Sequence, residues 1–199
     1  SPLQRSANTY VINFGDLEQK LSDPAVKLFV LCNPHNPAGR VWTPDELRRM
    51  NDLCLRHNVR VVSDEIHCEL TMPGYTYTPF ASVSDECLNN SVTLNSPSKS
   101  FNTAGLQIAN IISNDATIRQ RINRAININE VCDVNPFGVI ALQAAYNEGE
   151  AWLDALKAYL HANYVALQAF FSEHLPQLAV TKLEGTYLVW VDISSTGLD

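Results

Sequence analysis

Apolar and polar positions alternate along the chain in a pattern that predicts strands and helices in turn. Residues 28–32 form a continuous apolar run, which is typical of a strand buried on both faces of a sheet. Residues 43–46 (Thr-Pro-Asp-Glu) read as a capping box with proline at the first helical position. They predict a helix that runs to about His57, with Asn58 as its C-terminal stop. Residues 59–63 then predict a second strand, parallel to the first and reached by a right-handed crossover.

The same alternation continues to the end of the chain and indicates an α/β fold. Residues 150–174 predict one long amphipathic helix, after which the pattern changes to strands and suggests passage into a second domain. We interpret the apolar stripe of that helix as core packing; it consists of Trp152, Leu153, Leu156, Leu160, Tyr164, Leu167 and Phe171. The other expected elements are strands at 92–94, 107–112, 178–181 and 186–193 and helices at 114–127 and 136–146.

Composition and charge argue against several classes of protein. With 199 residues, 46% of them hydrophobic, the chain can bury a sizeable core. The net charge of −7 and the scattered basic residues argue against a nucleic-acid partner, which requires a basic face. No apolar run approaches the length of a membrane span, and no signal-peptide pattern begins at Ser1, so we expect a cytoplasmic protein. The five cysteines are unclustered and predict reduced thiols instead of disulfides or a zinc site.

Lys99 is the first candidate for chemistry. It lies in residues 96–102 (Ser-Pro-Ser-Lys-Ser-Phe-Asn), directly after the strand expected at 92–94. A lysine at a strand end, surrounded by hydroxyls, can form a Schiff base with an aldehyde cofactor whose phosphate the hydroxyls hold. Taken alone, however, this seven-residue segment fits a surface lysine in a serine-rich turn better than it fits a lysine that forms a Schiff base.

Two motifs upstream favour the chemical interpretation. Residues 33–40 (Asn-Pro-His-Asn-Pro-Ala-Gly-Arg) follow the first strand, at the sheet edge where parallel strands bind ligands. Their prolines and glycine can hold the Asn36 amide in place, although the same dipeptides also occur in ordinary turns. Asp64 closes the second strand and could keep a cofactor ring nitrogen protonated. Asp64, Glu65 and His67 could instead bind a metal, but neighbouring strand residues point to opposite faces and no second ligand cluster is evident.

The order and spacing of these motifs resemble the class I/II aminotransferases, which are fold-type I enzymes that use pyridoxal 5'-phosphate. Residues 31–42, 63–67 and 98–102 resemble in particular the MalY/PatB group of cystathionine β-lyases, or C–S lyases. The resemblance implies a three-layer α/β/α large domain, present in part, followed by the beginning of an α+β small domain. It places the C-terminal part of the cofactor-binding domain in residues 1–155, and the interdomain helix with the start of the small domain in residues 156–199.

The resemblance also implies roles for individual residues. Lys99 matches the lysine that forms the Schiff base and afterwards moves the α-proton. Asp64 matches the partner of the cofactor's pyridine nitrogen, and Asn36 matches the donor to its 3-oxygen. Ser96 and Ser98 occupy positions that contact the phosphate. The phosphate loop and the arginine that binds the substrate carboxylate would lie outside residues 1–199, so the chain looks like a piece of a larger protein.

Two positions depart from the aminotransferase pattern. His67 stands where transaminases usually carry a tyrosine that contacts the 3-oxygen, and Gln107 replaces an arginine that grips the phosphate. Both differences favour the lyase branch. We therefore expect α,β-elimination from cystathionine or cysteine-type amino acids by a homodimer. An aminotransferase is the alternative, because both reactions share the same carbanion. A regulatory protein that keeps this fold and acts through protein contacts is a further alternative.

Overall fold

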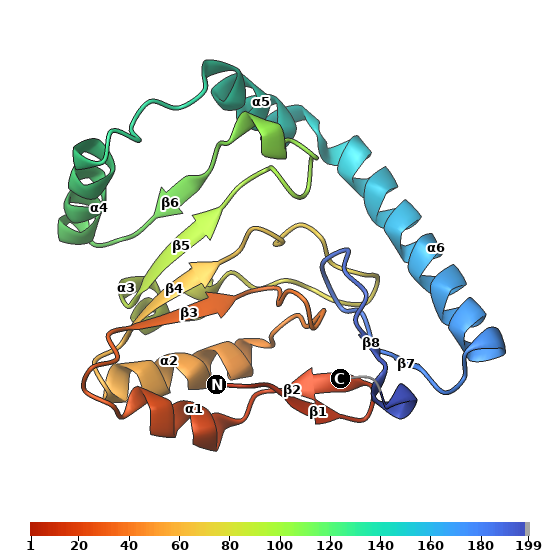
Figure 1. Ribbon diagram of the computed structural model, residues 1–199. Helices are drawn as coiled ribbons and strands as arrows, with labels where there is room; N and C mark the ends of the chain where they lie inside the picture. The colour runs from red at the N-terminus through yellow and green to blue at the C-terminus, as the bar shows by residue number, and fades with distance from the viewer. Residues whose placement is uncertain (198–199) are drawn as a thin grey trace.

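A four-stranded sheet forms the centre of the computed structural model, which describes residues 1–197 (Figure 1). Its strands are β3 (Leu28–Cys32), β4 (Arg60–Asp64), β5 (Ser91–Asn95) and β6 (Asn110–Ile112), hydrogen-bonded in that order. The first three are parallel and β6 runs antiparallel to β5. The predicted parallel strand–helix–strand unit is therefore confirmed, whereas the strand expected at 107–112 begins only at Asn110.

Two helices, α1 (Phe14–Leu21) and α2 (Pro44–Arg56), cover one face of this sheet. The capping box of α2 is confirmed, because the Thr43 hydroxyl accepts from Glu46 N at 3.2 Å and the Glu46 carboxylate accepts from Thr43 N at 2.9 Å. The predicted stop is confirmed as well, since Asn58 takes a left-handed backbone with φ 56°. The sequence pattern did not predict α1 or the short α3 (Asp85–Asn89), whose Cys87 joins the same core.

The opposite face of the sheet is largely open. Helix α4 (Ala116–Ile128) lies over it across a groove of 910 Å³. Leu28 and Val30 of β3 are 59% and 65% exposed, whereas Leu31, on the α2 side, is buried. The prediction that residues 28–32 are buried on both faces is therefore wrong for this chain. The reason is that no helix among residues 1–197 packs closely on Leu28 and Val30.

The remaining helices lead away from the sheet toward a small satellite region. α5 (Pro136–Glu148) is followed by α6 (Glu150–His174), whose bounds equal the predicted ones, and then by β7 (Ala179–Val180) and β8 (Val191–Asp192) (Figure 1). A hairpin of β1 (Gln4–Ser6) and β2 (Thr9–Val11) lies nearby. No helix in residues 1–197 combines the length and apolarity needed to cross a membrane.

Two predictions for this C-terminal region need correction. The strands expected at 178–181 and 186–193 pair over only two residues each, because residues between them bond to other loops instead. The stripe of α6 packs only in part. Tyr164 is buried against Met72 and Leu183, and Leu160 packs on that cluster, but Trp152 is 47% exposed.

Candidate active site

The register of the three parallel strands determines where the candidate site forms. Cys32 pairs with Asp64, and Asp64 pairs with Leu94. Two backbone bonds extend this alignment beyond the strands, from Asn33 N to Asp64 O at 2.9 Å and from Glu65 N to Leu94 O at 2.8 Å. The loops that carry the predicted site residues therefore leave adjacent strands at the same edge of the sheet.

The loop after β3 is a tight turn with Asn36 exposed at its tip. His35 N donates to Arg40 O at 2.8 Å, and Gly39 N donates to His35 O at 2.9 Å. Gly39 has φ +69°, a backbone conformation that favours glycine. At the base of the turn, the indole of Trp42 donates to Cys32 O at 2.8 Å. Asn36 is thus presented on a loop whose backbone is fixed on both sides.

The turn that carries Lys99 is bonded to its surroundings on both sides. The Ser96 hydroxyl donates to Ile108 O at 2.6 Å and accepts from Ser98 N at 3.1 Å. The buried Ser100 hydroxyl donates to Glu69 Oε2 at 2.6 Å, which connects the turn to the loop after β4. Lys99 itself is half-buried, and within residues 1–197 its amine has no hydrogen-bond or ion-pair partner. The turn therefore holds a free amine on a fixed backbone.

A pocket of 280 Å³ adjoins this amine. Ser98, Lys99 and Asn102 line one side of it, and α6 contributes an apolar wall that includes Trp152. Tyr187, from the segment before β8, completes the lining. Sequence reasoning interpreted Trp152 as core and missed Tyr187, since the only local signal there is a glycine two residues before an aromatic.

His67, which contacts Tyr187 of this pocket, carries an unpartnered polar atom. Its side chain is 3% exposed, and its Nδ1 is buried with no hydrogen-bond partner. The Tyr187 ring meets it edge-on, with 5.5 Å between ring centroids. Burial and the neighbouring Lys99 ammonium lower the pKa of His67, while the Asp64 carboxylate acts in the opposite direction. Lys99 and Asp64 therefore both lie close enough to His67 to act on its charge.

Glu65, the third member of the possible metal cluster, belongs to the core. Its carboxylate accepts from the Ser63 hydroxyl at 2.7 Å and from Phe80 N at 2.9 Å, and the Tyr77 hydroxyl also donates to it. These bonds satisfy a carboxylate that is only 2% exposed. Among residues 1–197, no group of three His, Cys, Asp or Glu side chains is placed to hold a metal ion. All five cysteines, which lie in this part of the chain, are free thiols.

The lowered pKa of His67 predicts a pH-dependent loss of stability on the acid side. The folded protein binds the His67 proton more weakly than the unfolded chain does, whose ordinary pKa is 6.5. The free energy of unfolding should therefore fall as the pH drops below that value, by at most about 1.4 kcal/mol per pH unit for one proton. The variant His67→Gln has no titrating group at this position, so its free energy of unfolding should lack this decrease.

Urea unfolding of the cofactor-free full-length protein between about pH 8 and pH 5 checks the prediction. The difference in free energy of unfolding between wild type and His67→Gln should shrink toward acid pH. Parallel curves for the two proteins would show that the pKa of His67 is not lowered.

The comparisons with known proteins agree with this arrangement of loops. Residues 2–197 match the family described as Aminotransferase class I and II. The chain is 46% identical over 198 residues to cystathionine beta-lyase PatB of Bacillus subtilis (strain 168), and the match covers 100% of this chain and 51% of that protein.

Two solved structures are similar over the whole chain. One is a pyridoxal-phosphate-bound putative aminotransferase from Clostridium difficile 630, with a TM-score of 0.96 and 43% identity over 100% of this chain and 51% of that one. The other is the pyridoxal-phosphate-bound C-S lyase from Staphylococcus hominis, with a TM-score of 0.92 and 36% identity over 100% and 51% of the two chains. The chain thus spans about half the length of these relatives. With its sheet, its loop order and this match over nearly every residue, it belongs to the class I and II aminotransferase family.

Proposed function

We propose that the full-length protein is a pyridoxal-phosphate-dependent C–S β-lyase that eliminates a thiol from cystathionine or cysteine-type amino acids. The observation that carries this proposal is the free amine of Lys99 at the same sheet edge as Asp64 and His67, whose buried Nδ1 has no partner among residues 1–197 and whose charge state both Lys99 and Asp64 influence. A relative named cystathionine beta-lyase and the structure of a C-S lyase support the choice of reaction. His67 and Gln107 favour the lyase over the aminotransferase on sequence grounds.

The residues at this edge fit the cofactor. When bound, pyridoxal phosphate supplies an electron sink for the negative charge that develops at the substrate's α-carbon. The Asp64 carboxylate would keep the proton on the pyridine nitrogen, and the exposed Asn36 amide would donate to the 3-oxygen. The buried Nδ1 of His67 has no other hydrogen-bond partner among residues 1–197, so a ligand atom there would satisfy it.

The two serines expected at the phosphate differ in their availability. The Ser96 proton is already donated to Ile108 O, whereas the Ser98 hydroxyl has no partner among the described residues. We therefore assign the stronger phosphate contact to Ser98, with Ser96 holding the Ser98 backbone in place. The assignment gives Ser96 a second role that the sequence motif did not indicate.

Lys99 would bind the cofactor and then act as the base that removes the substrate's α-proton. Its turn is fixed by the bond from Ser100 to Glu69 at 2.6 Å, so the amine can be aimed without reorganising the backbone. Loss of the α-proton lets the bond from the β-carbon to sulfur break, with the electron pair leaving on the thiolate. The remaining unsaturated amino acid hydrolyses to pyruvate and ammonia.

Three broader features belong to the same proposal. The cofactor-binding domain would end at residue 155, and residues 156–199, of which 198–199 lie outside the described residues, would form the interdomain helix and the start of the small domain. The full-length protein would be a cytoplasmic homodimer and would bind an amino acid as its small-molecule substrate. These features are inferred from the resemblance to the lyase branch.

Product analysis of the full-length protein with pyridoxal phosphate and cystathionine tests the proposal. Pyruvate and free thiol in equal amounts are expected. A keto acid that retains sulfur, formed only with an amino-group acceptor, would instead identify an aminotransferase. If added cofactor produced no visible absorbance band, the regulatory alternative would replace both enzymes.

A further inference from the structure

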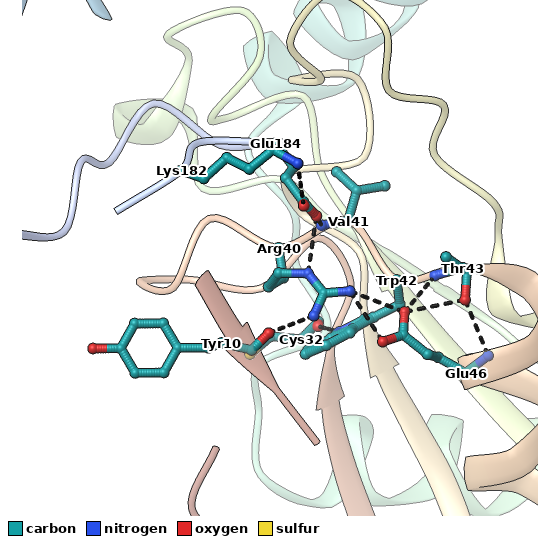
Figure 2. Close-up of polar contacts among 9 residues, drawn as sticks. All are labelled: Tyr10, Cys32, Arg40, Val41, Trp42, Thr43, Glu46, Lys182 and Glu184. Carbon is teal, nitrogen blue, oxygen red and sulfur yellow. Dashed lines mark hydrogen bonds and ion pairs between the residues drawn. The ribbon is translucent and has the colours of Figure 1, made fainter. Parts of the chain in front are cut away.

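A buried ion-pair network joins the Asn36 loop to the segment before β8. Arg40 is 7% exposed, and its Nε donates to Glu184 Oε2 at 2.9 Å (Figure 2). Its Nη2 donates to both carboxylate oxygens of Glu46 at 3.0 Å, and its Nη1 donates to Tyr10 O. Glu184 is also 7% exposed, and its Oε2 accepts from Val41 N at 3.1 Å. Buried charges persist only when they are paired and hydrogen-bonded in this way, so the network fixes both segments.

Backbone bonds strengthen the same junction. Glu184 N and Gly185 N both donate to Gly39 O, at 2.8 and 3.1 Å, and Thr186 N donates to Leu70 O at 2.7 Å. A Cβ at Gly185 would lie 2.8 Å from a Val41 methyl group, so only glycine fits there. Residues 184–186 are thus held between the loop after β3 and the loop after β4.

The junction determines where Tyr187 lies. This residue follows the fixed segment directly, and its ring stands edge-on to His67 while it lines the Lys99 pocket. It is 38% exposed, and no hydrogen bond to its hydroxyl is seen within residues 1–197. The position of the ring therefore depends on the backbone that carries it, and Arg40 and Glu184 anchor that backbone.

We propose that Tyr187 is a specificity-determining residue of the Lys99 pocket and that Arg40 and Glu184 are positioning residues that hold it there. The inference rests on the proposed function and deepens it. Together with Trp152 and Leu156 of α6, Tyr187 forms an apolar and aromatic wall, which favours apolar or thioether side chains over small ones.

Binding of two unreactive amino acids to the full-length holoenzyme tests this inference. L-Methionine carries a thioether but no β-leaving group, and L-alanine is small; both are titrated by the change in the cofactor's visible absorbance. Tyr187→Ala should weaken methionine binding about tenfold and alanine binding less than about twofold. Tyr187→Phe should bind both amino acids like the wild type, since it keeps the ring.

The positioning role is tested by a double-mutant cycle. Glu184→Gln should lower the preference for methionine in the same direction as Tyr187→Ala, and the double variant should be no weaker than Tyr187→Ala alone. Arg56→Gln, which breaks the exposed pair with Glu18, is the matched control and should change nothing.

Three other kinds of result would each contradict one part of the proposal. If Tyr187→Ala keeps the wild-type preference for methionine, Tyr187 does not form the wall. If the two losses are additive, or if Glu184→Gln lowers both affinities equally, Glu184 does not act through Tyr187. A wild-type protein without a cofactor band would overturn the proposed function, and this inference with it.

Discussion

Replacing Lys99 by alanine in the full-length protein should reduce pyruvate release from cystathionine by at least roughly 10³-fold, because one amine both binds the cofactor and moves the α-proton. Among residues 1–197, Lys99 is the one lysine that lines the pocket beside α6. Lys182 lies near Glu184, with 3.6 Å between Nζ and Oε1, and Lys20 pairs with Asp16 on α1. The substitution should also abolish the covalent link between protein and cofactor.

Borohydride reduction followed by mass analysis of the peptides measures that link. In the wild type, the reduced cofactor should be found on the peptide that contains Lys99. Lys20→Ala, on the exposed surface of α1, is the control and should keep both the adduct and the activity. A borohydride-stable adduct in Lys99→Ala would show that another amine holds the cofactor.

The structural features that depend on residues close together in the sequence could be predicted from it. The Thr43 capping box, the helix stop at Asn58 and the bounds of α6 depend on residues within a few positions of one another, and all three agree with the sequence pattern. The common edge of the Asn36, Asp64 and Lys99 loops follows from parallel pairing of consecutive strands, so it too could be predicted.

Contacts between distant segments could not be predicted in the same way. Tyr187 meets His67 edge-on, and Glu184 in the segment before it pairs with Arg40, which is 144 residues away in the chain. The Ser100–Glu69 bond likewise depends on two loops meeting. The strands expected at 178–181 and 186–193 are shorter than predicted for the same reason. Thr186, at the start of the second, bonds to Leu70, and residues 184–185 before it bond to Gly39.

The exposed face of β3 could not be predicted from the sequence for a different reason. An apolar run such as residues 28–32 indicates that both faces of a strand suit burial, but it does not say which segment covers them. Leu31 packs under α2, whereas Leu28 and Val30 face the open side of the sheet. Within residues 1–197, the face of β3 that carries Leu28 and Val30 is not covered, so the burial that the pattern indicates is not realised there.

Asp64→Asn should separate cofactor binding from catalysis. The carboxamide can still accept the bond that Asp64 Oδ1 receives from Ile66 N at 3.2 Å, so the backbone at the end of β4 should remain in place. It cannot stabilise a protonated pyridine nitrogen, however, and the electron sink weakens without that charge. We expect elimination to slow by roughly 10²- to 10³-fold, which corresponds to about 3–4 kcal/mol, while cofactor affinity changes far less.

A second measurement on the same variant does not depend on catalysis. Since the Asp64 carboxylate raises the pKa of His67 against the effects of burial and Lys99, its loss should lower that pKa further. An NMR titration of His67 in the cofactor-free full-length protein measures this shift. Asp52→Asn, on the exposed side of α2, should move neither the rate nor the titration. If Asp64→Asn eliminates thiol at nearly the wild-type rate while His67 shifts as expected, Asp64 lies beside His67 but is not the partner of the pyridine nitrogen.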